Sequence, residues 1–126
     1  MSAASFDHPA LAGTTPGLIH ALSDPRLARA LVAIHARPGH AWTLDALAAE
    51  AGMSRASFTA AFRRHVGRSA GDYLADYRML AAKRELSLGR PVARVSDELG
   101  YASPAAFARM FKARAGQTPK QWALQA

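Results

Sequence analysis

Apolar residues follow a helical period from Asp24 to the end of the chain. They recur at spacings of three and four residues, and no segment shows the alternation of β-branched and polar residues that is typical of a strand. Six of the seven runs begin with a residue that can cap a helix, and glycine or proline separates each run from the next. The predicted caps are Asp24, Thr43, Ser54, Ser69, Ser103 and Thr118, and the predicted breaks are Pro38, Gly39, Gly52, Gly67, Gly89, Pro91, Gly100 and Gly116. The pattern predicts an all-α fold of seven helices.

The longest predicted helix covers about residues 70–87 and is apolar on two sides. Tyr73, Tyr77 and Leu80 form one side, and Met79, Ala82 and Leu86 form the other. Such a helix suits a central strut that contacts a separate core at each end. The predicted organisation is a first unit at about 24–69, this linker helix, and a second unit at about 91–126. Residues 1–23 have no sustained period and are rich in turn-forming residues, so they are expected to be a flexible leader or the remnant of a linker.

An internal repeat joins the two predicted units. Six residues recur 49 positions later: Ser54, Phe58, Phe62, Gly67, Ser69 and Tyr73 correspond to Ser103, Phe107, Phe111, Gly116, Thr118 and Trp122. Upstream the offset is 48, which pairs Leu44, Leu47, Ala51 and Gly52 with Val92, Val95, Leu99 and Gly100. The second copy therefore has one extra residue, which a turn can absorb.

Each copy has the order of a helix-turn-helix unit: a short helix, a turn that opens with glycine, and a second helix capped by serine. Glycine permits the positive φ that such a turn needs, and a small residue four positions earlier, Ala48 or Ser96, lets the two helices cross closely. Any two-helix hairpin in a helical bundle would meet the same packing demands. The pattern alone therefore leaves a plain structural role open.

The distribution of charge favours a nucleic-acid partner. The chain has 16 Lys and Arg against 9 Asp and Glu, a formal net charge of +7. Residues 55–68 contain four arginines and no acid, and residues 104–126 also contain basic residues and no acid. The acids Asp45, Glu50, Asp97 and Glu98 lie on the first helix of each pair. Positive charge is thus concentrated on the second helices, as expected of helices that contact a polyanion.

These segments resemble the DNA-binding domain of AraC-type transcription regulators. The resemblance covers about residues 24–124, and its most specific part is GYASPAAFARMFKARAGQTP. It implies seven helices in which two helix-turn-helix subdomains, joined by a long central helix, place recognition helices in successive major-groove segments of double-stranded DNA. An 18-residue strut would span about 27 Å, close to the ~34 Å turn of B-DNA once helix widths are added. The resemblance to activators also implies contact with RNA polymerase.

The predicted outer faces of the second helices supply the candidate readers of DNA. If the phenylalanine pairs are buried, the 100° step of a helix exposes the residues opposite them. The candidates for reading bases are Arg55, Ala56, Thr59, Ala60, Ala105, Ala108 and Arg109, and the candidates for contacting phosphates are Arg63, Arg64, Arg68, Lys112 and Lys120. Arg109 lies mid-face and suits a bidentate contact to a guanine edge, whereas Ala56 and Ala60 offer only apolar contact, for instance with thymine methyl groups.

Other functions fit the sequence less well. Residues 67–71 match the G-x-S-x-G nucleophile elbow, but that motif needs a preceding strand, and the pattern favours Ser69 as a helix cap and no enzyme activity. The chain has no cysteine, no apolar run long enough for a membrane span and no signal-peptide pattern, so we expect a cytoplasmic protein without metal, cofactor or small-molecule site. Two alternatives stay open: an architectural helical protein that binds nucleic acid without sequence preference, and a helical adaptor for an acidic protein.

Overall fold

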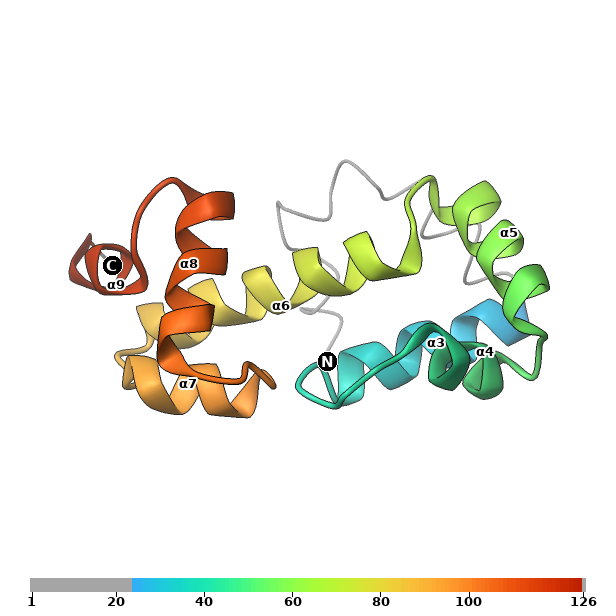
Figure 1. The fold of residues 1–126 in the computed structure, drawn as a ribbon, viewed down its shortest axis with the longest axis horizontal. Coiled ribbons are helices and arrows are strands. Elements are labelled where there is room, and N and C mark those ends of the chain that lie inside the picture. The colour runs from blue at the N-terminus through green and yellow to red at the C-terminus, as the bar shows by residue number, and fades with distance from the viewer. Residues whose placement is uncertain (1–23, 126) are drawn as a thin grey trace. The chain divides into compact units, whose positions relative to one another are not determined.

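The computed structural model describes residues 24–125, and these form seven α-helices and no strand (Figure 1). The helices are α3 (Pro25–Ala36), α4 (Leu44–Ala51), α5 (Arg55–Val66), α6 (Ala70–Ser87), α7 (Val92–Glu98), α8 (Pro104–Ala115) and α9 (Pro119–Gln125). The predicted all-α fold of seven helices is confirmed. The predicted leader at 1–23 lies outside the described residues. Within residues 24–125, no helix is both long and apolar enough to cross a membrane.

The predicted caps determine where the helices begin. The side chains of Asp24, Thr43, Ser54 and Ser103 accept hydrogen bonds from backbone N–H groups in the first turns of α3, α4, α5 and α8. Ser69 Oγ accepts from Asp72 N at 3.1 Å. These bonds satisfy amide donors that have no partner within a helix, each stabilising by about 1 kcal/mol. The exception is α7, whose N-cap position is Pro91 and which has no side-chain cap.

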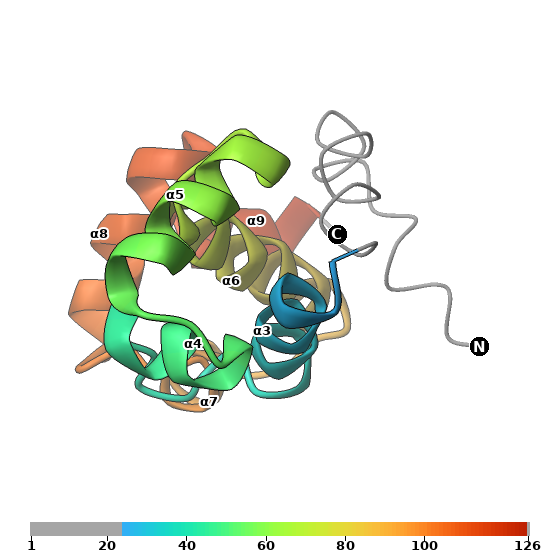
Figure 2. The same ribbon diagram turned by 90° about the vertical axis from the view of Figure 1, so that its right-hand side faces the viewer.

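The first of two compact units consists of residues 24–37 and 42–76 of the described chain. Helix α3 packs against α4 and α5, and Figure 2 shows these three helices nearest the viewer. The core comprises Leu27, Ala30, Leu31, Ile34, Leu47, Ala48, Ala51, Phe58, Ala61, Phe62, Val66, Ala70, Tyr73 and Leu74. The core includes Leu47, Ala51, Phe58 and Phe62 of the internal repeat, whereas Leu44 of that repeat is only partly buried.

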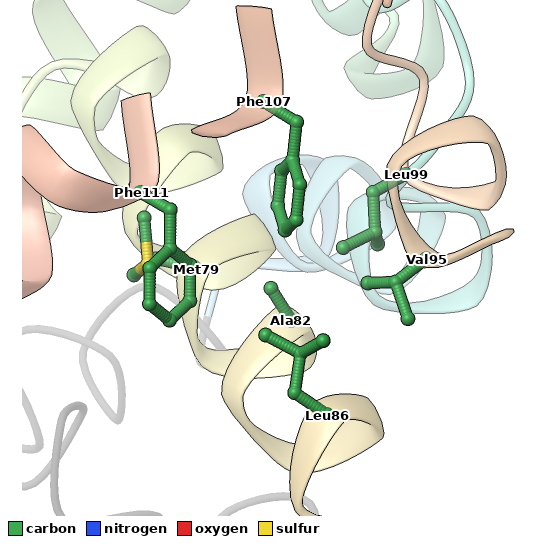
Figure 3. Close-up of a cluster of buried hydrophobic side chains, with 7 residues drawn as sticks. All are labelled: Met79, Ala82, Leu86, Val95, Leu99, Phe107 and Phe111. Carbon is green, nitrogen blue, oxygen red and sulfur yellow. The ribbon is translucent and has the colours of Figure 1, made fainter. Parts of the chain in front are cut away.

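The second unit consists of residues 38–41 and 77–125 of the described chain. Its core gathers Met79, Ala82, Leu86, Val95, Leu99, Phe107 and Phe111 from α6, α7 and α8 (Figure 3). The figure shows Phe107 reaching from α8 toward Leu99 on the α7 side. Helix α6 therefore belongs to both units, with its first turns in one core and its last turns in the other. Of its predicted apolar positions, Tyr77 and Leu80, near the point of division, are only half-buried.

The short segment 38–41 packs in the second unit although the helices on either side of it belong to the first. Arg78 holds this segment: Nε donates to the Pro38 carbonyl oxygen at 2.6 Å, and a terminal nitrogen donates to that of His40 at 2.8 Å. A side chain on Gly39 would overlap the carbonyl oxygen of Glu98. The sequence has no local signal for this arrangement, because these contacts join residues that are far apart in the chain.

Candidate nucleic-acid interface

Buried aromatic rings fix the second helix of each helix-turn-helix pair. In the first unit, the ring centroids of Phe58 and Phe62 lie 5.5 Å apart, and Tyr73 meets Phe62 edge-on at 5.9 Å. The corresponding rings of the second unit repeat the arrangement, with 5.8 Å between Phe107 and Phe111 and 6.1 Å between Phe111 and Trp122. All four phenylalanines are fully buried. The repeat seen in the sequence is thus a repeat in space, and each triad leaves the opposite side of its helix for solvent.

The turns between the paired helices have the predicted geometry. Gly52 and Gly100 adopt left-handed conformations, with φ of 69° and 81°. The small residues four positions earlier, Ala48 and Ser96, are buried where the helices cross. Ser96 Oγ also donates to the carbonyl oxygen of Ser103 at 3.2 Å, so the buried hydroxyl of Ser96 is satisfied. Both turns therefore allow the second helix to pack closely against the first.

The outer face of α5 has an apolar centre with arginines at both ends. Ala56, Thr59 and Ala60 are all exposed, as predicted, and lie at neighbouring positions of one face. Thr59 Oγ1 donates to the carbonyl oxygen of Arg55 at 2.8 Å, so its proton is held by the helix backbone. An open surface depression is lined by Arg55, Ala56, Thr59, Ala60, Arg63 and Arg64. The predicted readers of the first unit therefore form one continuous surface.

The arginines of the first unit differ in their surroundings. Arg63 and Arg64 are exposed in the last turn of α5. Arg55 Nε lies 3.8 Å from Asp45 Oδ1 on α4, and both side chains are largely exposed. Arg68 is only partly exposed and forms an ion pair with Asp76 of α6. A DNA phosphate would thus have to compete with the Asp76 carboxylate for Arg68, or share Arg68 with it.

The outer face of α8 carries cations near its middle. Ala105, Arg109 and Lys112 are exposed as predicted, whereas Ala108 is partly buried and presents less surface than its helical position predicts. Arg114 Nε contacts the sulfur of Met110 at 3.3 Å. Lys120 is exposed on α9. No acidic residue occurs in α8 or in α5, so neither helix can neutralise its own arginines and lysines.

Two features of this interface had no signal that sequence reasoning could have used. The Arg68–Asp76 pair joins the turn after α5 to α6, and the Thr59 hydroxyl bond depends on a choice of rotamer. The exposed basic and small residues, in contrast, follow directly from the spacing of the phenylalanines. The helical period therefore predicted which residues are exposed to a partner, but not which residues of this chain each of those side chains contacts.

Known proteins are similar to this chain in sequence and in fold. The profile of the helix-turn-helix domain family matches residues 47–125. An AraC-like transcription regulator of Streptomyces antibioticus is 36% identical over 104 residues, which are 82% of this chain and 34% of the regulator. The regulatory protein SoxS of Escherichia coli K12 is 31% identical over 80 residues, 63% of this chain and 75% of SoxS.

A solved structure extends the similarity to the fold. The DNA-binding domain of AdpA, a global transcriptional factor crystallised with a target DNA, has a TM-score of 0.72 and 28% identity, and the match covers 81% of this chain and 92% of that one. The chain spans about a third of the length of the AraC-like regulator. The repeated units, the family profile and these relatives agree: the chain belongs to the AraC-type family of helix-turn-helix DNA-binding domains.

Proposed function

We propose that this chain binds double-stranded DNA with sequence specificity and so regulates transcription, α5 and α8 each entering a major-groove segment. One observation carries the proposal: each of these helices buries an aromatic pair on one side and exposes an acid-free, cationic surface on the other. A helix of this kind fits the major groove and can contact base edges and phosphates together. The DNA in the AdpA complex, and the names of the relatives as regulators, support the same function.

The proposed roles follow the position of each side chain on its helix. Residues in the centre of an outer face approach bases, and those toward its margins approach the backbone. We assign base contacts to Arg55, Ala56, Thr59, Ala60, Ala105, Ala108 and Arg109, and phosphate contacts to Arg63, Arg64, Arg68, Lys112 and Lys120. Arg109 is the principal reader, because its guanidinium can donate two hydrogen bonds to guanine O6 and N7.

The proposal assigns regulation by binding rather than by catalysis. Ser69 of the elbow-like motif caps α6 and follows a helix, so it lacks the strand that would expose a nucleophile. Contact with RNA polymerase, implied by the resemblance to activators, belongs to the same proposal. So does a cytoplasmic location, since the relatives are bacterial and bacterial DNA lies in the cytoplasm.

Selection of bound duplexes from a random pool tests the proposal. The purified chain should enrich sequences with two short preferred segments about one helical turn apart. The salt dependence of binding to a selected duplex and to a scrambled one should be measured alongside, because phosphate contacts contribute equally to both. Equal affinity for both duplexes would overturn sequence specificity and favour an architectural protein that binds by charge alone.

A further inference from the structure

The centre of the α5 outer face offers methyl groups and no hydrogen-bond donor. Ala56 and Ala60 end in methyl groups, and Thr59 adds a third. The Thr59 hydroxyl has its proton committed to the Arg55 carbonyl oxygen at 2.8 Å. The three positions are spaced i, i+3 and i+4, so their methyl groups form a single small apolar patch. This patch is exposed to solvent, unlike the other side of the helix with its buried phenylalanines.

Arginines at both ends of this patch match it to DNA rather than to an apolar protein surface. Arg55 stands at the first position of α5, and Arg63 and Arg64 stand in its last turn. All three are exposed, and together with the three small residues they line one open depression. A partner must therefore present negative charge on either side of a narrow apolar strip. The major groove has this form, with phosphates along both edges and base edges between them.

In the major groove, one apolar group protrudes from the base edges. It is the methyl group on C5 of thymine, and 5-methylcytosine carries the same group at the same place. Guanine, adenine and unmodified cytosine present donors and acceptors, which three methyl groups cannot satisfy. Covering those polar groups without partners is unfavourable, whereas bringing methyl groups together removes apolar surface from water.

We infer that α5 recognises C5-methyl groups of pyrimidines, using the methyl groups of Ala56, Thr59 and Ala60 as its contact surface. The inference rests on the proposed function and specifies the DNA that the first unit prefers. Arg63 and Arg64 hold the helix in the groove through phosphates, Arg55 contacts a base at the start of the helix, and the methyl contacts supply the preference at the centre of the face. A segment bound by α5 should accordingly be rich in thymine, or carry methylated cytosine in its place.

Base analogues test the inference directly. The segment bound by α5 is first identified as the one whose preference does not change in Arg109→Ala. Replacing a contacted thymine there by uracil removes only the methyl group, and binding should weaken about fourfold per methyl lost. Where cytosine replaces that thymine, 5-methylcytosine should restore about the same factor relative to unmodified cytosine. The same exchanges outside the two bound segments serve as the control and should change nothing.

A matched pair of variants assigns the effect to Thr59. Thr59→Val keeps the methyl group and removes the hydroxyl, so the preference for thymine over uracil should persist. Thr59→Ser keeps the hydroxyl and removes the methyl group, so that preference should shrink. The opposite pattern would overturn the inference, since the hydroxyl would then be the reader. The inference would also be overturned if uracil weakened binding but 5-methylcytosine did not strengthen it relative to unmodified cytosine.

The proposed function can fail separately. If uracil exchange has no effect on a duplex that the protein still distinguishes from scrambled DNA, the inference is wrong and sequence-specific binding stands. If no duplex is preferred at all, the proposed function is wrong.

Discussion

The two helix-turn-helix units have nearly the same frame and different surfaces. Their aromatic triads agree to within a few tenths of an ångström in ring separation. On the outer faces, however, the position of Ala60 in α5 corresponds to Arg109 in α8, 49 residues later. Residues that set helix packing are thus repeated, whereas the residue available to a base edge has changed from a methyl group to a guanidinium. Packing and recognition are separable in this fold because they occupy opposite sides of the same helix.

The turns of the two units also differ, in how much space they leave. A side chain added at Gly52 would meet only the flexible end of Arg29, at 3.4 Å. At Gly100 it would overlap the carbonyl oxygen of Gly39, a backbone atom in the segment that Arg78 holds. Both glycines have positive φ, so an alanine would be strained at either position. Only at Gly100 would the added side chain also clash with a backbone atom.

The largest expected effect is a difference in stability between alanine substitutions in the two turns. Gly52→Ala should lower the free energy of unfolding by about 1–2 kcal/mol, the cost of a left-handed alanine. Gly100→Ala should lower it by about 2–5 kcal/mol, since overpacking against a backbone atom is added. Urea unfolding measures both, and Gly67→Ala, with nothing within 4 Å of the added carbon, is the control for strain alone. Equal losses at Gly52 and Gly100 would show that the close approach of Gly39 does not constrain the second turn.

The second prediction exchanges the recognition chemistry of the two faces. Arg109→Ala should weaken binding to the selected duplex by about 1–3 kcal/mol and relax the preference at one base pair. Ala60→Arg should do the reverse and introduce a preference for guanine in the other segment. Competition binding with single-base variants of the duplex measures both.

Arg64→Ala is the matched control for this exchange. As a phosphate contact, Arg64 should affect all duplexes alike, and its loss should reduce the salt slope by about one. If Arg109→Ala also weakens all duplexes uniformly, Arg109 contacts the backbone and does not read a base.

The sequence predicted the parts of this molecule that depend on local signals. Ser54 and Ser103 cap their helices, and the phenylalanine pairs are buried, because cap chemistry and helical phase act within a few residues. The packing of segment 38–41 was not predictable in this way. Arg78 reaches it across 38–40 positions in the chain, and proline and glycine at 38 and 39 signalled only a break. The Arg68–Asp76 pair likewise depends on how the turn between α5 and α6 lies against α6.

The third prediction concerns a difference in pH sensitivity. In the first unit, His35 Nε2 lies 2.6 Å from the hydroxyl of Tyr73, whereas the corresponding Trp122 donates to the carbonyl oxygen of Lys83 at 3.2 Å. Burial lowers the pKa of His35 below its ordinary value of 6.5. As the pH falls below 6.5, the unfolded chain takes up a proton at His35 before the folded chain does. The free energy of unfolding should therefore be constant above pH 6.5 and should fall as the pH drops from there toward the lowered pKa of His35 in the folded chain.

Urea unfolding at a series of pH values measures this fall. His35→Gln should flatten it, because glutamine can still bond to Tyr73 but does not titrate. Trp122→Phe, in a place without a histidine partner, should lower stability and leave the pH dependence unchanged. A profile unaltered by His35→Gln would assign the acid sensitivity to other titratable groups.

The smallest expected effect comes from an ion pair that one unit has and the other lacks. Asp45 and Arg55 correspond to Ala93 and Pro104, which cannot form such a pair. Because both partners are exposed and their charged atoms are 3.8 Å apart, Asp45→Asn should change stability by less than about 0.5 kcal/mol. Asp45→Asn should nevertheless raise the affinity for DNA about twofold at low salt. The carboxylate of Asp45 no longer competes with DNA for Arg55, and one negative charge fewer repels the DNA phosphates. Glu50→Gln, on the same helix but without a described ion pair, should raise it less. If affinity at low salt is the same for Asp45→Asn as for the unaltered chain, Arg55 takes no part in the contact with DNA.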